Sequence, residues 1–504
     1  MQMNITRRKA IQSLALTGTG VLLSKCGPSS GKVRRPNIIF IMTDDQTINQ
    51  MSCYGHPVLR TPNMDRIARE GTRFNNCFCT NSLCAPSRAS VLTGCYSNIN
   101  GITGNSERKG AEEKLNPELP TFPELLKGAG YYTALIGKYH IRHDPGGFDE
   151  WRILPGQGAY FDPEFIENGI TTQNRGYVTD IITDKAIDFL KQADTDRPFC
   201  LVYQHKGPHR PFTPAPRHAH LWENIEFPYP ESFDDDYATR RIAELAKDMK
   251  IEISLENDYD DLPESLSAAD KKKWIYQRFA KDMCRAVVGI DENLGRVLDL
   301  LDSLGITDDT LIVYTSDNGF FVGEHGWYDK RFMYEPSLRI PLIIRYPRLG
   351  SPGQVSGEMI LNVDFAPTIL DIAGIPVPEN MHGRSLRPIL EGNKPADWRE
   401  TVYYSYYEDS WRMYKNVRKE DLSDTTYTKY FTTHRVGPHH GVRTDRYKLI
   451  EYYSEDDYWE LFDLETDPDE LKNLYCVPGY EDITRKLTGE LRRLQKIYGP
   501  EELI

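Results

Sequence analysis

The sequence has little of what would place the protein on a membrane or on nucleic acid. Its one apolar run of note, residues 10–23, is too short to cross a bilayer as a permanent helix. Basic residues are the minority, with 61 Lys and Arg against 74 Asp and Glu. The resulting net charge of −13 argues against general binding to nucleic acid or anionic membranes. An anionic substrate is not excluded, because a local cationic pocket can form within an acidic protein.

Cysteine pairs with the spacing of a zinc site are also missing. Among nine cysteines, Cys77 and Cys79 are separated by a single residue, which is too close for a usual structural zinc knuckle. The chain of 504 residues has no internal repeat and no low-complexity linker. Its 39% hydrophobic and 27% charged content is ordinary for a globular protein with a sizeable core.

The first 35 residues differ from the rest because they include basic residues but no acidic ones. Residues 7–9 are basic and precede the apolar run, an order typical of an export signal. Residues 22–26 resemble a bacterial lipoprotein cleavage box, and residues 6–9 loosely resemble a twin-arginine signal. We therefore expect residues 1–35 to direct export from a bacterial cytoplasm, to the periplasm or to the cell envelope through a lipid on Cys26. An N-terminus without a targeting role is the alternative.

Alternating strand and helix patterns predict an α/β fold. Five short apolar runs are typical of strands buried on both faces, and they cover residues 37–41, 133–137, 199–203, 311–315 and 342–346. Helical periodicity covers residues 179–192 and 271–304. This alternation predicts a large, mostly parallel sheet between helices. An acidic, weakly patterned segment at 234–261 is interpreted as an exposed insertion.

The pattern changes at about residue 385. Aromatic, alternating segments at 401–407, 447–453 and 459–464 predict a smaller antiparallel sheet, and residues 480–498 predict a closing helix. We therefore expect three parts: a leader and tether (1–35), a catalytic domain (36–385) and a C-terminal α+β subdomain that completes the substrate pocket (386–504).

Polar residues follow four of the five predicted buried strands, at the edge where open α/β sheets form ligand sites. The first strand is followed by Asp44 and Asp45, and a later one by Asp317 and Asn318. Alone, an Asp-Asp pair is more often a solvated turn. Adjacent carboxylates repel one another, however, and a divalent cation with oxygen ligands would relieve that repulsion.

The sharpest local pattern is Cys-Ala-Pro-Ser-Arg at residues 84–88, followed by a segment that ends in Thr-Gly at 93–94. A buried Cys ahead of a helix that begins with Pro would explain Pro86, but not the polar groups elsewhere in the chain. The pattern resembles the signature of the type I formylglycine-dependent sulfatases, in which a maturation enzyme oxidises the Cys to formylglycine. Three further elements resemble that family: Gly-Lys-Tyr-His at 137–140, His-Lys-Gly-Pro-His-Arg-Pro-Phe at 205–212 and Gly-Glu-His-Gly-Trp-Tyr-Asp-Lys at 323–330.

The resemblance implies an alkaline-phosphatase-like fold and a defined set of site residues. The catalytic residues would be Cys84, Arg88, Lys138, His140, His209 and Lys330. One Ca²⁺ would be bound by Asp44, Asp45, Cys84, Asp317 and Asn318. Substrate contacts are predicted for His205, His325, His439, His440 and Arg443, although a structural role is equally compatible with the last three.

The resemblance also implies a role for each catalytic residue. Arg88 and Lys138 would support the hydrated aldehyde formed at residue 84. His140 would take a proton in the step that expels sulfate. His209, with Lys330, would protonate or stabilise the departing sugar oxygen.

The segments at 37–46, 77–94, 404–409 and 441–450 are most similar to N-acetylglucosamine-6-sulfatases, which act on glycosaminoglycans or mucin-type glycans. Sulfatases for uronate 2-O-sulfate, glucosamine N-sulfate or choline sulfate remain alternatives. A phosphodiesterase or phosphonate hydrolase of the same superfamily is a further one. A sugar-binding lipoprotein with a degenerate site is disfavoured, because every expected catalytic position is filled.

Overall fold

The computed structural model describes residues 35–105, 113–193, 197–408, 434, 436–453 and 458–499. The predicted export signal and Cys26 lie outside these residues. Among the described helices, none has the length and apolar character that a membrane crossing requires.

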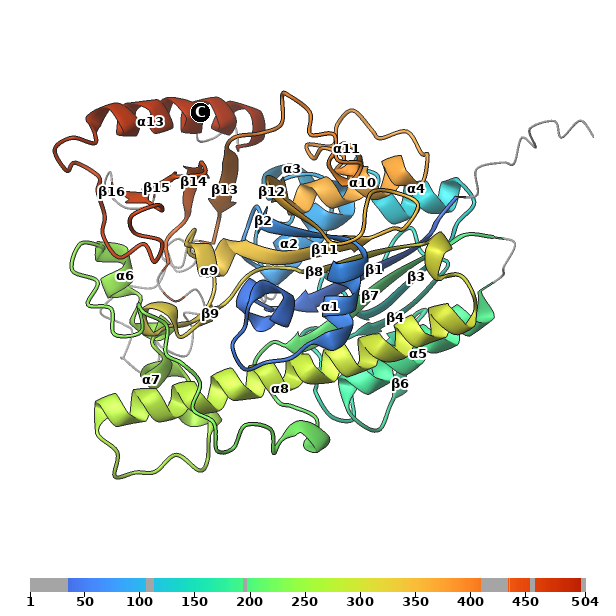
Figure 1. The fold of residues 1–504 in the computed structure, drawn as a ribbon, viewed down its shortest axis with the longest axis horizontal. Coiled ribbons are helices and arrows are strands. Elements are labelled where there is room, and N and C mark those ends of the chain that lie inside the picture. The colour runs from blue at the N-terminus through green and yellow to red at the C-terminus, as the bar shows by residue number, and fades with distance from the viewer. Residues whose placement is uncertain are drawn as a thin grey trace, which may run out of the picture. The chain divides into compact units, whose positions relative to one another are not determined.

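A mixed sheet of ten strands forms the centre of the described part of the chain (Figure 1). Its spatial order is β12 (Gln354–Leu361), β2 (Thr72–Phe78), β11 (Arg339–Arg345), β8 (Thr310–Ser316), β1 (Asn37–Asp44), β7 (Phe199–Pro208), β3 (Tyr132–Lys138), β4 (Glu150–Leu154), β5 (Glu164–Glu167) and β6 (Ile170–Gln173). The five strands from β8 to β4 are parallel to one another. The predicted parallel sheet is therefore confirmed at its centre.

Both flanks of the sheet contain antiparallel strand pairs, so the sheet is mixed and has fewer parallel pairs than predicted. Strand β11, predicted from the run 342–346, pairs antiparallel with both β8 and β2. At the opposite edge, β5 and β6 form a hairpin that the apolar pattern did not reveal. Its turn is Asn168-Gly169, with positive φ at both residues, which matches the strand twist of a two-residue hairpin.

Helices cover both faces of the sheet, which explains why the central strands are continuously apolar. In β1, Ile38 and Phe40 pack into one hydrophobic cluster, whereas Ile39 and Ile41 pack into the other. The first cluster includes residues of α2 (Cys84–Thr93), α4 (Phe122–Gly128) and α10 (Phe365–Ile372). The second includes residues of α1 (Pro62–Glu70), α5 (Val178–Gln192) and α8 (Ala268–Ser303). The two predicted long helices are thus α5 and α8.

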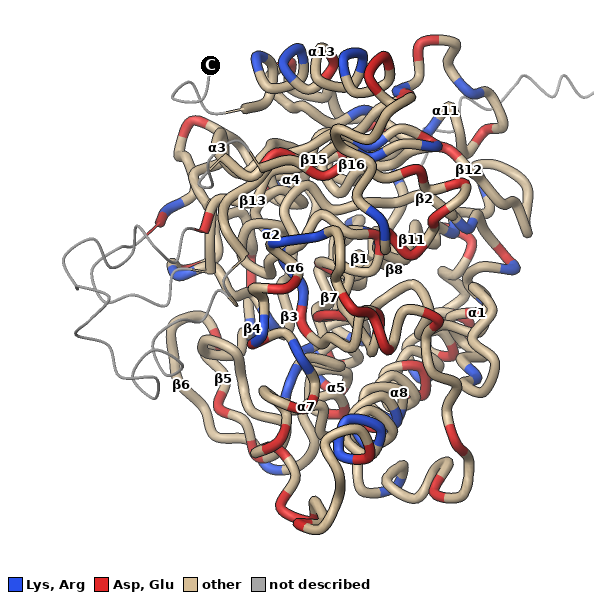
Figure 2. The backbone as a smooth tube through the Cα atoms, turned by 90° about the vertical axis from the view of Figure 1, so that its left-hand side faces the viewer, with Lys and Arg blue, Asp and Glu red and all other residues tan. Residues whose placement is uncertain are grey.

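A four-stranded antiparallel sheet lies in the C-terminal region, as predicted. Its order is β13 (Val402–Tyr406), β14 (His439–Arg443), β15 (Tyr447–Tyr452) and β16 (Tyr458–Asp463). Helix α13 (Glu481–Tyr498) packs on it and carries acidic and basic residues side by side (Figure 2). Strand β14 was not predicted as a strand. Residues 35–504 form one compact unit, so the boundary at residue 385 stays a prediction.

The segment at 234–261 was expected to be exposed, and it is exposed only in part. It contains α6 (Arg241–Leu245), η4 (Lys247–Met249), α7 (Ile251–Ser254) and η5 (Glu256–Asp258). Several of its apolar residues are buried, namely Ile242, Met249, Ile251 and Leu255, whereas Leu245 and Ile253 are exposed. Apolar residues scattered among many acids gave no clear period, which is why the pattern concealed this packing.

Candidate active site

The carboxylates of the site come from the ends of two adjacent parallel strands. Asp44 is the last residue of β1 and Asp45 follows it, whereas Asp317 and Asn318 follow β8. All four side chains are buried. The backbone N–H of Asp45 donates to Asp317 Oδ1 over 3.1 Å, and Asn318 Nδ2 donates to Asp45 Oδ1 over 2.7 Å. The strand order therefore brings together the residues that the sequence placed 272 positions apart.

These carboxylates crowd one another in a buried place. Burial, opposed by Lys330 but reinforced by Asp44 and Asp317, raises the pKa of Asp45 to about 7. Burial and the Asp44 carboxylate also raise the pKa of Asp317. Asp44 differs: burial would raise its pKa, but Lys138, His209 and Arg88 together lower it well below the usual value. Such crowding is relieved when a cation binds among the oxygens.

The oxygen atoms fit a divalent metal ion. Asp44, Asp45 and Asp317 each offer a carboxylate oxygen, and these oxygens lie within 4.8 Å of one another. The buried Oδ1 atom of Asn318 has no hydrogen-bond partner among the described residues. An acceptor buried without a partner is costly, and a hard cation would satisfy it. Cys84 Sγ also lies near this group, in a set with Asp44 and His209.

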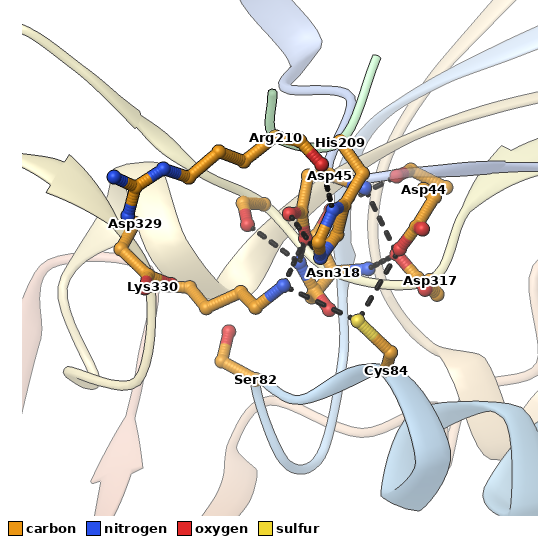
Figure 3. Close-up of polar contacts among 12 residues, drawn as sticks. Asp44, Asp45, Ser82, Cys84, His209, Arg210, Asp317, Asn318, Asp329 and Lys330 are labelled. Carbon is orange, nitrogen blue, oxygen red and sulfur yellow. Dashed lines mark hydrogen bonds and ion pairs between the residues drawn. The ribbon is translucent and has the colours of Figure 1, made fainter. Parts of the chain in front are cut away.

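Cys84 begins helix α2, directly beside the carboxylates (Figure 3). Its Sγ atom is 3.2 Å from Asp44 Oδ1 and 3.2 Å from the ammonium of Lys330. The helix has Pro86 in its first turn and ends at Gly94, whose φ of 67° is the left-handed conformation that glycine favours. Partial positive charge at the start of the helix favours an anion near residue 84.

Arg88 and Lys138 are fully buried and contact the clustered carboxylates. Arg88 donates to Asp317 Oδ2 through Nε and Nη2, over 3.0 and 2.9 Å, and through Nη1 to Gln204 Oε1 over 3.0 Å. Lys138 Nζ donates to Asp44 and, over 2.6 Å, to Gln157 Oε1. Neither Gln157 nor Gln204 was predicted. Gln204 lies just beyond the run at 199–203, so its place at a strand end was a signal, whereas Gln157 lies in a loop and gave none.

His140 lies just after β3, where β3 and β7 approach each other closely. A Cβ atom on Gly137 would lie 1.7 Å from the carbonyl oxygen of Gln204, so only glycine fits there. The buried Nδ1 atom of His140 has no partner among the described residues. Burial and the positive charge of Lys138 lower the pKa of His140 well below its usual value. The ring is therefore neutral near pH 7 and able to accept a proton.

His209 and Lys330 approach the clustered carboxylates from other loops (Figure 3). His209 follows β7, and its Nδ1 atom is 2.7 Å from the carbonyl oxygen of Arg210. That oxygen can only accept, so Nδ1 carries a proton and Nε2 faces Asp45 Oδ2 at 3.7 Å. Lys330 follows the short strand β10 (Tyr328–Asp329) and donates to Asp45 and to Cys84. All six predicted catalytic residues thus converge on one region.

The five residues that were predicted to contact substrate do not belong to this cluster. Their side chains contact other parts of the protein instead. His205 is buried against Tyr203, and His439 is buried among aromatic rings with its Nδ1 atom 2.9 Å from the carbonyl oxygen of Gly437. The others pair with acidic side chains: His325 with Asp235, His440 with Glu451 and Arg443 with Glu335. Their contact with substrate stays a prediction.

Comparisons with known proteins agree with this geometry. The Sulfatase family profile matches residues 36–375, and a profile for the C-terminal part of N-sulphoglucosamine sulphohydrolase matches residues 410–497. An N-acetylglucosamine-6-O-sulfatase of Bacteroides thetaiotaomicron is 43% identical, over 96% of this chain and 91% of its own length. The human N-acetylglucosamine-6-sulfatase is 27% identical over 97% of this chain and 89% of its own length.

Solved structures share the fold. The structure of BT4656 in complex with its substrate D-glucosamine-2-N,6-O-disulfate has a TM-score of 0.82 and 43% identity, over 92% of this chain and 98% of that one. The phosphonate monoester hydrolase of Agrobacterium radiobacter, with a TM-score of 0.71 and 20% identity, covers 92% of this chain and 96% of its own and is similar in fold alone. Profile, identity and architecture agree: the chain belongs to the sulfatase family, the hydrolases of sulfuric esters.

Proposed function

We propose that the protein removes the 6-O-sulfate group from N-acetylglucosamine units of glycosaminoglycan or mucin-type glycans. The observation that carries this proposal is the 43% identity, over nearly the whole chain, to an N-acetylglucosamine-6-O-sulfatase. The substrate bound in the similar solved structure also carries a sulfate at the 6-O position. Export of the protein to the periplasm or cell envelope, where such glycans are met, is part of the proposal.

The proposal includes two groups that the chain itself does not encode. Asp44, Asp45, Asp317 and Asn318 would hold one Ca²⁺, because their clustered oxygens include an acceptor without a partner among the described residues. Cys84 would be converted to formylglycine by a maturation enzyme. When present, the ion would withdraw charge from the ester sulfate, and the hydrated aldehyde would supply the hydroxyl that attacks sulfur.

The cations of the chain neutralise and orient the ester. Arg88, Lys138 and Lys330 surround residue 84, and each is fixed by a carboxylate. A sulfate monoester resists attack because of its own negative charge, so fixed cations lower the barrier by electrostatic stabilisation and by holding the ester in line. Gln157 and Gln204 keep Lys138 and Arg88 in place through hydrogen bonds.

Two histidines move protons at opposite ends of the reaction. His140 is neutral, and its Nδ1 acceptor is not used by any described residue, which suits it to take the proton when sulfate is expelled from residue 84. His209 presents Nε2 to the site while the Arg210 carbonyl fixes Nδ1. Nε2 would deliver a proton to the departing sugar oxygen only after taking one up, because Nδ1 holds the single proton of the neutral ring. Burial lowers the pKa of His209 well below its usual value, so this proton would be taken up in the presence of the anionic ester, while Lys330 stabilises the negative charge of the leaving oxygen.

A glucosamine N-sulfatase activity is the second candidate. It is favoured by the match of residues 410–497 to the C-terminal part of N-sulphoglucosamine sulphohydrolase. That match covers the smaller C-terminal region, whereas the 43% identity extends over 96% of the chain. We therefore rank the 6-O-sulfatase first.

A panel of defined esters tests the proposal. The protein is co-produced with a maturation enzyme, and formylglycine at residue 84 is checked by peptide mass. Sulfate release is then measured from N-acetylglucosamine-6-sulfate, glucosamine N-sulfate, N-acetylgalactosamine-6-sulfate, a 2-O-sulfated uronate disaccharide and choline sulfate, with Cys84→Ala as the control. A matched phosphodiester and phosphonate ester test the superfamily alternatives.

The disulfate of glucosamine separates the two candidates within one molecule. We expect loss of the 6-O-sulfate with the N-sulfate retained, and the fastest monosulfate to be N-acetylglucosamine-6-sulfate. First release of the N-sulfate would assign the second function instead. Faster turnover of the phosphorus esters than of every sulfate would overturn both.

A further inference from the structure

The acidic segment that was expected to be exposed makes a buried contact with the loop that carries Lys330. Asp235 accepts two hydrogen bonds from Nη2 of Arg240, over 2.5 and 2.6 Å. Its Oδ2 atom is also 2.7 Å from Nδ1 of His325. His325 lies in η7 (Glu324–Gly326), five residues before Lys330. We call these three residues, Asp235, Arg240 and His325, the loop clamp.

The loop clamp is a buried ion pair with a fixed charge. The side chains of Asp235, Arg240 and His325 are exposed by 2%, 0% and 1%. Burial alone would raise the pKa of Asp235, but hydrogen bonds from His325 and Arg240 outweigh it and lower the pKa to about 2. The carboxylate is therefore ionised at any pH at which the enzyme would be assayed. Removing one member of such a pair leaves an unbalanced buried charge.

The loop held by the clamp has a backbone that needs support. Strands β9 (Phe321–Val322) and β10 pair antiparallel, so the two ends of the loop lie side by side. His325, Asp329 and Arg331 have φ values of 57°, 76° and 92°, the left-handed region that residues other than glycine rarely adopt. Such conformations persist only where surrounding contacts hold them, and Lys330 lies between two of these residues.

Further contacts connect the acidic segment to both the loop and the C-terminal sheet. The hydroxyl of Tyr237 donates to the carbonyl oxygen of His325 over 2.5 Å, and the ring of Tyr237 stacks on Trp327 at 5.4 Å. On its other side, the backbone N–H of Arg241 donates to the hydroxyl of Tyr458 in β16 over 2.8 Å. The segment therefore packs between the loop and β16, and it fixes the loop from outside the catalytic residues.

We propose that the loop clamp is a positioning device for Lys330, which sets where the ammonium stands relative to residue 84. The inference rests on the proposed role of Lys330 in the reaction. The three clamp residues stand apart from the reacting atoms and act through the hairpin. His325 anchors its tip to Asp235, and Lys330 leaves its second strand to reach Asp45 and Cys84 (Figure 3).

A double-mutant cycle tests the clamp against a merely structural role. The mature full-length protein is compared with Asp235→Asn, Lys330→Met and the double variant, on whichever sulfate ester the wild type turns over fastest. The matched control is Asp234→Asn, since Asp234 is the next residue, is 78% exposed and pairs with Lys272 at the surface. Thermal melting of every variant shows whether it is folded at the assay temperature.

Coupling through Lys330 gives a specific pattern. Asp235→Asn should lower kcat about tenfold with KM nearly unchanged, because a small displacement of a positioned group costs rate rather than affinity. Lys330→Met should lower kcat about a hundredfold, and the double variant should lose no more than Lys330→Met does. Asp234→Asn should leave kcat unchanged.

Other outcomes overturn the clamp. Losses that multiply to about a thousandfold in the double variant mean that Asp235 acts independently of Lys330. A lowered melting temperature with unchanged kcat means that the clamp only stabilises the fold. If Asp235→Asn does not fold, the same cycle is run with His325→Asn, because Asn tolerates a positive φ. Silence of the wild type on N-acetylglucosamine-6-sulfate with turnover of another ester would count against the proposed function and leave the clamp testable.

Discussion

The strand-end edge of the large sheet and the C-terminal sheet both bury many charged side chains, but they arrange them differently. Around the C-terminal sheet, acids and bases alternate, and one of the acids, Glu335, comes from helix α9 (Glu335–Leu338). Glu335 accepts from Arg443 over 3.0 Å and from Lys448 over 2.9 Å, and Lys448 also pairs with Glu470 over 2.6 Å. At the strand-end edge, three carboxylates converge on one another, and the Asn318 oxygen beside them has no partner among the described residues.

The difference shows which property of buried charge points to function. Burial raises the pKa of Glu470 to about 7, the same value as for Asp45 in the site, and each of these two carboxyl groups pairs with a lysine, Lys448 and Lys330 respectively. A raised pKa therefore does not separate the two regions. Convergence of like charges does, because it destabilises the folded protein unless a ligand compensates it.

Substitution of Cys84 should give the largest difference between the regions. Cys84→Ala removes the group that becomes the nucleophile, so we expect kcat to fall by about 10⁴-fold or more on every ester. The thiol's polar contacts are with Asp44 and Lys330, which keep other partners, so the melting temperature should stay within a few degrees. The check is sulfate release together with thermal melting. Substantial turnover by a Cys84→Ala preparation that is free of contaminating enzyme would contradict the formylglycine mechanism.

His209→Ala should give the next largest effect, and one that depends on the leaving group. A sugar alkoxide is a poor leaving group and needs a proton, so we expect kcat on N-acetylglucosamine-6-sulfate to fall about 10²- to 10³-fold. An aryl sulfate with a good leaving group needs little help and should lose less than about tenfold. Equal losses on both esters would argue against a leaving-group role for His209.

The sequence predicted the residues of the site better than it predicted the strands at the edge of the large sheet. Buried parallel strands read as continuous apolar runs, and their carboxyl ends meet at one edge, so the order of residues was enough to place Asp44 near Asp317. The Cys-x-Pro-Ser-Arg pattern added residue 84. The β5–β6 hairpin was harder to find, because short strands at a sheet edge carry no continuous apolar run, although Asn168-Gly169 was a turn signal in the sequence.

The roles of single buried histidines could not be predicted in the same way. His325, His439 and His440 lie in segments near site motifs, but each ring has a partner that comes from a different part of the fold or from the neighbouring backbone. A histidine that is held by Asp235 or Glu451 looks the same in sequence as one that binds sugar. The structure adds these contacts, and substrate contact by the three histidines stays a prediction. The acidic segment that supplies Asp235 has no clear period of its own.

Glu335→Gln tests whether the ion cluster beside the C-terminal sheet supports stability and not catalysis. It leaves Arg443 and Lys448 as buried cations with one acid between them, so we expect a loss of about 3–5 kcal/mol in the free energy of unfolding. Because Glu335 pairs with these cations and not with residue 84 or the carboxylates at the strand ends, kcat at 25 °C should stay within about threefold of the wild type. Chemical denaturation measures the first quantity and initial rates the second. A large fall in kcat with unchanged stability would make this ion cluster part of the active site.

Metal addition gives the smallest expected effect. It directly distinguishes Asp45 from Glu470, the two carboxyl groups whose pKa is raised to about 7. If Asp45 belongs to a Ca²⁺ site, adding Ca²⁺ at about 100 times its Kd to chelator-treated protein should stabilise the folded state by about 2.7 kcal/mol. Asp45→Asn removes one charged ligand and the repulsion that drives binding, so most of this stabilisation should disappear. Glu470→Gln is the matched control, because Glu470 is equally buried and has the same raised pKa, yet lies in the C-terminal ion cluster. Whatever Glu470→Gln does to the baseline stability, its gain on adding Ca²⁺ should equal that of the wild type. An equal gain in Asp45→Asn would place the ion elsewhere, and convergence of carboxylates would then no longer distinguish the two regions.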